Sequence, residues 1–344
     1  MSLAVKRFNI VRIFLNKSIF DENIIHIILN YYWKKLDNKR KILLDCIDIN
    51  KLEWDSLCIN SNAIDLLENN IDKINWSAIC CNTNAINLIK KYLKEDKLDE
   101  LDEDVYCNFW YGLTINPNAI EILSKNKDKI YWKCLSLNPN AIELLEDNQD
   151  KINWTRISKN LNAIHILENN QDKIDWDLLS ANPNAINILE NNLDKIYWKY
   201  LSLNPNAIEL LENNIDKINW SNLSENPNAI HILENNQDKI DWEMLSKNIN
   251  AIDLLKKNLD KVDWNILPIN PNAIELLELL EYDKINWSFL SINPHAIDLL
   301  KKRIKYENNL TKTTYNKLRI KNRIDWDKLS LNPSIFQDEP MPTI

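Results

Sequence analysis

Residues 132–153 have the sequence WKCLSLNPNAIELLEDNQDKIN, and the residues that follow repeat its main features from Trp154 onward. From Trp110 to Trp264 every step between tryptophans is 22 residues. A fixed period of this kind indicates a repeat architecture, in which each copy forms one supersecondary unit. The chain has 13 tryptophans, and twelve of them begin a copy of the unit. They are Trp54, Trp76, Trp110, Trp132, Trp154, Trp176, Trp198, Trp220, Trp242, Trp264, Trp287 and Trp326.

Each unit contains two short helix signals. In the unit quoted above, Asn138 and Pro139 predict the start of one helix, because Asn is favoured as a helix cap and Pro at the first helical position. The apolar residues of 141–145 then follow with the spacing of one helical face. The other helix is expected to begin at the tryptophan, since Asn153 before Trp154 is again a favoured cap.

Helices this short do not hold in water alone, so each unit must bury its apolar face against its neighbours. We therefore predict an all-α, elongated solenoid of about a dozen 22-residue, two-helix repeats. Its axis would span roughly 100 Å at the usual spacing of packed helices. We expect the tryptophans to form the centre of its core, because an indole buries a large apolar area. The alternative is a β/α solenoid resembling leucine-rich repeats, which the alternating polar and apolar residues of Lys-Ile-Asn-Trp would suit.

The period divides the chain into three parts. Residues 1–50 do not fit the repeat, and we expect them to form an N-terminal helical cap over the exposed face of the first unit. Residues 51–336 form the repeat solenoid, with insertions near residues 94–104 and 301–323. Residues 337–344 are expected to be a tail.

The two insertions carry opposite charges. Residues 94–104 contain seven acidic side chains and two lysines. Residues 301–323 contain nine Lys or Arg and one acid, a local charge of +8, so the rest of a chain with net charge −8 sums to −16. Insertions in solenoids usually form loops on one face, often the binding face. The other interpretation is that both are solvated linkers.

Composition argues against catalysis. The chain has one glycine and four histidines, so neither a glycine-rich phosphate loop nor a histidine metal cluster is expected. The carboxylates recur with the repeat, and no nucleophile and base stand out from it. We predict a protein that is not an enzyme and has no cofactor and no metal. The six cysteines lack paired CxxC spacing, and the chain has neither a secretory signal nor a membrane span, so an intracellular protein that is not secreted is expected.

Positions that vary between copies are the candidates for binding a partner. One row lies on the solvent side of the second helix of each repeat and is mostly acidic; the other follows each tryptophan by two residues and mixes apolar, aromatic and polar groups, as protein interfaces do. The first row includes Glu143, His165, Asn187, Glu209 and His231, and the second includes Arg156, Tyr200, Met244 and Phe289. The expected partner is a protein of unknown identity. Nucleic acid is not expected, because only Lys301–Arg323 is basic enough to attract phosphate, and no membrane partner is expected.

The unit Asp-Lys-Ile-Asp-Trp-x-x-Leu-Ser-x-Asn-Pro-Asn-Ala-Ile-x-Leu-Leu-Glu-x-Asn, matched closely by Asp172–Asn192 and Asp216–Asn236, resembles the tandem repeat of uncharacterised proteins of giant DNA viruses of amoebae. The resemblance covers roughly Trp54 to Pro333. It implies a non-catalytic protein-interaction scaffold that engages a host or viral protein, in the host cytoplasm or in the virion. The family brings no established activity.

Two other functions are compatible with the sequence. Residues 19–32, IFDENIIHIILNYY, resemble the opening helix of an F-box, a segment that recruits a ubiquitin-ligase adaptor. With such a segment in residues 1–50, the repeats would act as a substrate-recognition arm. The third possibility is a structural protein of the virion.

Overall fold

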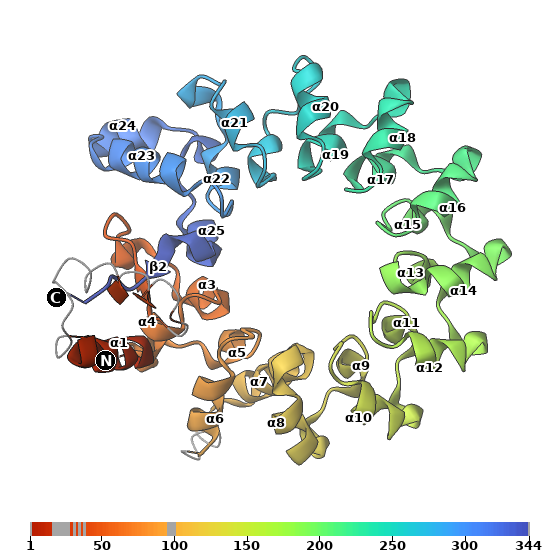
Figure 1. Ribbon diagram of the computed structural model, residues 1–344, viewed down its shortest axis with the longest axis horizontal. Coiled ribbons are helices and arrows are strands. Elements are labelled where there is room, and N and C mark those ends of the chain that lie inside the picture. The colour runs from red at the N-terminus through yellow and green to blue at the C-terminus, as the bar shows by residue number, and fades with distance from the viewer. Residues whose placement is uncertain are drawn as a thin grey trace.

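The computed structural model describes residues 2–15, 28–29, 32–33, 36, 39–94 and 101–342. Residues 51–336 form twelve helical repeats in two concentric layers, and the stack curves until its last repeat meets its first (Figure 1). The predicted all-α solenoid is confirmed. Its axis, which we expected to extend along one direction, instead describes a ring.

The inner layer consists of the helices that contain the repeat tryptophans; in the repeat of Trp264, the 3-10 helix η12 (Leu267–Ile269) takes this place. These inner helices are α3 (Trp54–Ile59), α5 (Trp76–Ile79), α7 (Glu103–Ile115), α9 (Trp132–Leu135), α11 (Trp154–Ile157), α13 (Trp176–Ser180), α15 (Trp198–Leu201), α17 (Trp220–Glu225), α19 (Trp242–Lys247), α22 (Trp287–Leu290) and α25 (Trp326–Leu331).

The outer layer consists of the helices that follow the Asn-x-Asn-Ala segments, in most of which x is Pro; before α23 the segment is Asn-Pro-His-Ala. They are α4 (Ile64–Glu68), α6 (Ile86–Lys94), α8 (Ile120–Lys125), α10 (Ile142–Glu146), α12 (Ile164–Glu168), α14 (Ile186–Glu190), α16 (Ile208–Glu212), α18 (Ile230–Glu234), α20 (Ile252–Lys257), α21 (Ile274–Leu277) and α23 (Ile297–Asn308). In most repeats a 3-10 turn, such as η6 (Gln149–Lys151), then leads to the next inner helix.

The expected helix caps are present. The Asn153 side chain accepts a hydrogen bond from the backbone N–H of Arg156 at the start of α11, and Asp175 caps α13 in the same way. Tyr131 and Tyr197, which occupy this position before α9 and α15, make no side-chain cap. The outer helices begin later than predicted. The Asn138 side chain accepts a hydrogen bond from the backbone N–H of Asn140, but the α-helix α10 begins only at Ile142.

A buried asparagine in each repeat joins it to the repeat before. The Asn160 amide donates to the backbone carbonyls of Ser136 and Asn138, at 3.1 and 3.0 Å, while its carbonyl oxygen accepts from the N–H of Asn162. Equivalent bonds recur in every repeat, and all twelve asparagines are at most 3% exposed. We call this set the Asn ladder: Asn60, Asn82, Asn116, Asn138, Asn160, Asn182, Asn204, Asn226, Asn248, Asn270, Asn293 and Asn332.

The core is mainly a continuous band of leucine, isoleucine and alanine. Of the repeat tryptophans only Trp110 and Trp287 are buried in it, whereas we expected all of them there. The residue three positions after each tryptophan is fully buried, as Ile157 and Leu179 are, whereas Trp154 and Trp176 are only half-buried at the edge of the core. In seven repeats the outer part of the indole is covered by the lysine 19 residues further along the chain, just before the next repeat begins. Lys173 lies 4.5 Å from the ring centroid of Trp154, and six other repeats place the same lysine 4.3–4.8 Å from the ring. Such cation–π contacts stabilise each interface modestly.

The curvature follows from the packing of the inner layer. Consecutive inner helices contact one another directly, for example α3 with α5, α5 with α7, and α17 with α19. Each repeat is therefore a wedge that is narrow at the inner helix and wide at the outer one. A per-repeat rotation sets the curvature of a solenoid, and twelve repeats close a circle when the rotation averages about 30°.

The seam between the last and first repeats reproduces a normal repeat interface, with α25 packed against α3. Asn60 donates to the carbonyls of Ser330 and Asn332 at 2.8 and 3.1 Å. Lys51 lies 5.1 Å from the ring centroid of Trp326, in the place that Lys173 takes over Trp154. The Asn ladder thus runs around the whole ring without an end.

Two short strands join the two ends of the repeat array at the seam, and we call this pair the clasp. β1 (Lys41–Leu43) pairs antiparallel with β2 (Phe336–Asp338), so that Ile42 lies opposite Gln337. Lys41 forms an ion pair with Asp338 at 2.8 Å and donates its backbone N–H to Asp65 of α4. The segment expected to be a free C-terminal tail therefore contains part of the clasp.

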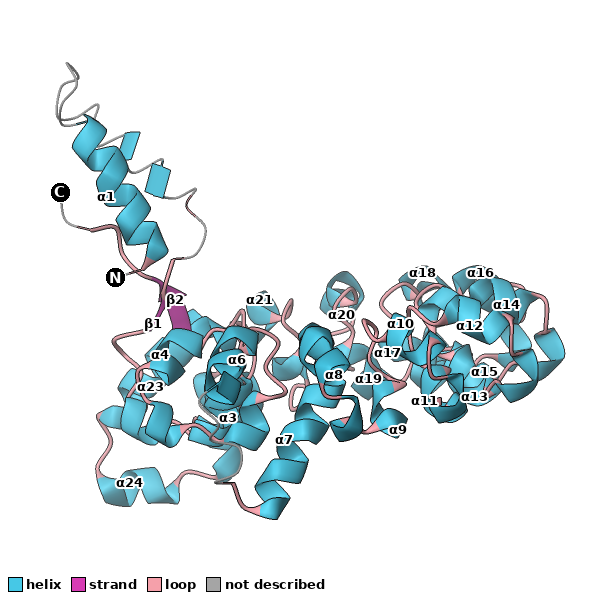
Figure 2. Cartoon of the chain, turned by 90° about the horizontal axis from the view of Figure 1, so that it is seen from below, coloured by secondary structure: helices cyan, strands magenta, loops and turns pink. Residues whose placement is uncertain are grey.

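The face of α3 on which we expected an N-terminal cap is occupied by α25. Leu44 and Ile47 of the N-terminal segment pack into the core of the ring. The helix α1 (Leu3–Leu15) instead stands off the ring beside the clasp (Figure 2). Its Ala4 and Phe8 pack with Leu29 and Trp33 in a separate small cluster. Of the F-box-like run, residues 19–27, 30 and 31 lie outside the described residues.

Where the structure describes them, the insertions extend helices, whereas loops or solvated linkers were the two interpretations of the sequence; residues 95–100 of the first insertion lie outside the described residues. α7 begins at Glu103, well before Trp110, and α23 continues to Asn308 and is followed by α24 (Lys312–Lys317). Arg303 anchors the second insertion: it is 1% exposed, bonds Glu307 at 2.9 Å, and lies 4.8–5.5 Å from the rings of Tyr282, Trp287 and Tyr306.

Candidate functional site

The predicted acidic row lies on the outer helices. Each of its members follows the isoleucine that begins one of α10, α12, α14, α16 and α18, and all of them are exposed. They are Glu143, His165, Asn187, Glu209 and His231. Because these helices succeed one another around the outside of the ring (Figure 1), the row runs along its outer circumference.

Members of this row pair with charges of neighbouring helices. His165 contacts the Glu146 carboxylate of the preceding repeat at 2.6 Å, and His231 contacts Glu212 in the same way at 2.7 Å. Glu121, the equivalent residue of α8, lies between Lys90 and Lys125, and the hydrogen bonds from these lysines lower its pKa to about 2. Exposed pairs of this kind contribute little to stability, so the row remains accessible to a partner.

The predicted mixed row lies on the inner helices α11, α15, α19 and α22 and is half-buried. Arg156 donates to the Cys134 sulfur of the preceding repeat at 3.0 Å, and Tyr200 packs edge-on against Tyr197. Lys247 contacts the Met244 sulfur, and the ring of Phe289 is covered by a lysine of the next repeat at 4.9 Å. These residues partly serve packing, and the two predicted rows lie on opposite layers of the ring, so they do not form one surface.

A third row was not predicted from the sequence. The residue five positions after each repeat tryptophan is apolar in nine of the twelve repeats, and several of these side chains are well exposed, including Ile59 at 48% and Leu137 at 38%. We call the nine residues the inner collar: Ile59, Cys81, Ile115, Leu137, Ala181, Leu203, Ile269, Ile292 and Leu331.

The inner collar lies at the ends of the inner helices or in the turns that follow them. Ile59 and Leu331 are the last residues of α3 and α25, whereas Leu137 follows the end of α9 at Leu135. Since the inner helices border the central opening (Figure 1), the inner collar belongs to the layer next to the opening. The signal in the sequence is an apolar residue directly before the buried Asn, in a segment where a polar residue is usual.

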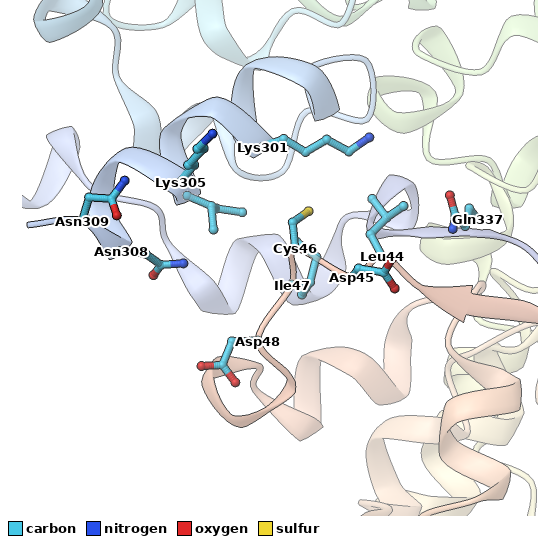
Figure 3. Close-up of a pocket in the computed structure, with 11 residues that line it drawn as sticks. Leu44, Asp45, Cys46, Ile47, Asp48, Lys301, Lys305, Asn308, Asn309 and Gln337 are labelled. Atoms are coloured by element: carbon cyan, nitrogen blue, oxygen red, sulfur yellow. The ribbon is translucent and has the colours of Figure 1, made fainter.

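The seam carries a cavity with a volume of about 760 Å³. The segment Leu44–Asp48 forms one wall and α23, with Lys301 and Lys305, forms the other; Cys46 lies between them (Figure 3). Asn308, Asn309 and Gln337 complete the polar lining, and Ile47 and Ile304 contribute apolar surface.

A second cavity of about 420 Å³ adjoins the first and shares Asn308 with it. It is lined by Lys51, Lys312, Tyr315 and Trp326, among others. The Lys51 ammonium donates to the Asn308 side chain at 3.0 Å, between the two cavities. Burial raises the pKa of the Tyr315 hydroxyl. We call the two cavities together the seam groove.

The described residues provide no other obvious chemical centre. No group of three or more His, Cys, Asp or Glu side chains among them is placed to hold a metal ion. No helix in the described ranges is long and apolar enough to cross a bilayer. Comparison of the chain with models of protein families, with curated proteins and with solved structures finds no match.

Proposed function

We propose that this protein is a non-catalytic, ring-shaped scaffold that binds a protein partner. The observation that carries the proposal is the inner collar, in which five of the nine apolar side chains are exposed on the layer next to the opening and four are half-buried. Isolated exposed apolar residues need no explanation, but apolar side chains that recur at one position of one layer are a candidate protein-binding surface. The half-buried Tyr200, Met244 and Phe289 lie on the same layer and supply residue types that are enriched at interfaces.

The acidic outer row is consistent with a charged outer surface and a partner-binding inner layer. Glu143, Glu209 and their neighbours keep the outside of the ring charged, which favours solubility. The resemblance noted above suggests that the partner is a host or viral protein and that the ring acts in the host cytoplasm or in the virion. The adaptor function expected from residues 1–50 gains no support from the described residues.

The proposal predicts that polar substitutions in the inner collar abolish partner capture. The unchanged ring should retain a host or viral protein at a stoichiometric level. A bait carrying Leu137→Gln, Ile269→Gln and Ile292→Gln should retain at least tenfold less of this protein. The three positions are 38–39% exposed, so the ring should still fold, which circular dichroism can check. Quantitative mass spectrometry of the bound fraction measures the effect.

A matched bait with Glu143→Gln, Glu209→Gln and Glu275→Gln changes as many exposed residues on the outer row and should retain the partner. Equal loss with both baits, or unchanged capture by the collar variant, would contradict the proposal. A third bait that lacks residues 1–38 keeps the clasp strand β1. If ligase adaptors are recovered and disappear with this deletion, the chain acts in ubiquitin ligation instead.

A further inference from the structure

At the seam groove the ring departs from its repeat and forms a concave site. Its walls come from the segment Leu44–Lys51, from α23 and α24, and from the start of α25. The ladders elsewhere on the ring are architecture, because they recur in every repeat. The seam groove does not recur, so its residues need a separate explanation.

The groove and its surroundings are rich in cations. Four lysines line it, namely Lys51, Lys301, Lys305 and Lys312. Lys301 also pairs with Asp298 at 3.6 Å, and Lys51 donates to Asn308. The carboxylate of Glu307 is already bound by Arg303 and by the N–H of Ile324, which leaves Asp45 and Asp48 as the opposing acids in the groove. Next to it on α23, α24 and the turn that follows lie more exposed cations, and the stretch 299–323 exposes no carboxylate. These cations are Lys302, Lys317, Arg319 and Lys321.

The other side chains of this stretch suit a phosphate backbone. Phosphate oxygens are bound in proteins by Lys and Arg together with Ser, Thr, Asn, Gln and Tyr. Thr311, Thr313, Thr314 and Asn316 are exposed among the cations, and the groove adds the amides of Asn308 and its neighbours. Lysine, which predominates here, binds phosphate as a point charge and does not require the planar geometry that suits arginine.

One aromatic residue indicates unpaired bases. Tyr315 lines the second cavity beside Lys312, and the Arg323 guanidinium lies 4.8 Å from the centroid of its ring. Trp326 also lines the cavity, but Lys51 covers its ring as in the other repeats. A cationic groove that contains aromatic rings is the arrangement by which proteins bind single strands, because every base can stack on an aromatic face. A duplex offers its phosphates but keeps its bases stacked inside.

We propose that the seam groove binds single-stranded nucleic acid through its phosphates and bases, without sequence preference. Nucleic acid is not expected from the sequence, because only Lys301–Arg323 is basic. The acidic row lies on the outer helices and the mixed row on the inner helices. The groove instead combines residues of the N-terminal segment, the second insertion and the last repeat into a local basic surface. This site is independent of the protein-binding inner collar.

The test is fluorescence anisotropy with the full chain and a fluorescein-labelled oligo(dT) of twelve nucleotides. The oligonucleotide should bind, and raising the salt from 50 to 200 mM should weaken binding about 50-fold if the four groove lysines contact phosphates. The double variant Lys305→Glu, Lys312→Glu should weaken binding at least tenfold. Tyr315→Leu, which keeps an apolar side chain, should weaken it about tenfold through lost stacking.

The control variant Lys127→Glu, Lys199→Glu makes the same change of net charge at exposed lysines of other repeats and should bind as the unchanged protein does. Equal loss in both double variants would overturn the proposal, as would binding of the corresponding duplex as tight as that of the single strand. Anionic phosphatidylserine vesicles and poly-glutamate are the other arms of the experiment. If either binds through the same lysines while the oligonucleotide does not, the surface serves a membrane or an acidic protein and the proposal is wrong.

Discussion

Asn204→Ala should lower the free energy of unfolding by about 3–5 kcal/mol, because it removes three hydrogen bonds and takes their partners from the Ser180 carbonyl and the Asn206 N–H, each loss costing about 1–3 kcal/mol. The Asn182 carbonyl keeps the N–H of Ala185. The Asn204 amide donates to the carbonyls of Ser180 and Asn182 at 3.1 and 3.0 Å, and its oxygen accepts from the N–H of Asn206. The side chain is 0% exposed, so water cannot replace these bonds without opening the interface.

Asn206→Ala is the matched control. Asn206 also reaches the preceding repeat, donating to the Pro183 carbonyl at 3.0 Å, but it is exposed and water can take over its single bond. We expect a loss below about 1 kcal/mol. Urea unfolding followed by circular dichroism and indole fluorescence compares the two variants. Similar losses at both positions would mean that the Asn ladder does not hold the repeats together.

Asn60→Ala should be as harmful as Asn204→Ala, although Asn60 belongs to the first repeat. In an open stack the amide of the first repeat would face solvent, and its removal would cost almost nothing. In the ring Asn60 is 3% exposed and donates to Ser330 and Asn332, so the Ser330 carbonyl loses this donor as the Ser180 carbonyl does in Asn204→Ala, and about 3–5 kcal/mol is again expected.

The comparison of Asn60→Ala with Asn204→Ala measures the seam against an interior interface in the same unfolding experiment. Asn62→Ala serves as the control at the seam, since Asn62 makes only the peripheral bond, to the Pro333 carbonyl at 3.0 Å. If Asn60→Ala unfolds at the same urea concentration as the unchanged protein, the seam carries no stabilising contact and the ring is not closed in solution.

The helical repeats were predictable because each one carries its own local signals. The 22-residue period, the Asn or Asp caps before the tryptophans and the leucine spacing all act within a few residues. Closure was not predictable in this way, because it depends on a small rotation that accumulates over twelve interfaces. No single repeat contains the information that the twelfth will meet the first.

The Asn ladder shows how one side chain can hide a second role. Asn138 was interpreted as a helix cap, and its oxygen does accept from Asn140. Its amide group, however, donates hydrogen bonds to the preceding repeat, and this contact cannot be predicted from the sequence of one repeat. The burial of the tryptophans was overestimated for a related reason. Their size indicated full burial, but the ring of Trp154 is covered by Lys173, just before the next repeat begins.

Of the candidate sites, the sequence located the exposed outer row and the basic charge of residues 301–323. It did not locate the seam groove, whose walls combine residues as distant as Cys46, Lys305 and Gln337. Such a site exists only because the ring closes and brings both ends of the repeat array together. Its chemistry was visible in the sequence as local charge, while its shape was not.

Electron microscopy of single particles of the full-length protein tests the central claim most directly. A closed ring should give face-on averages with an unbroken circumference around a central opening, and the same averages should recur with Asn206→Ala. Open arcs, rods or spirals as the main class of particles would contradict the closed ring.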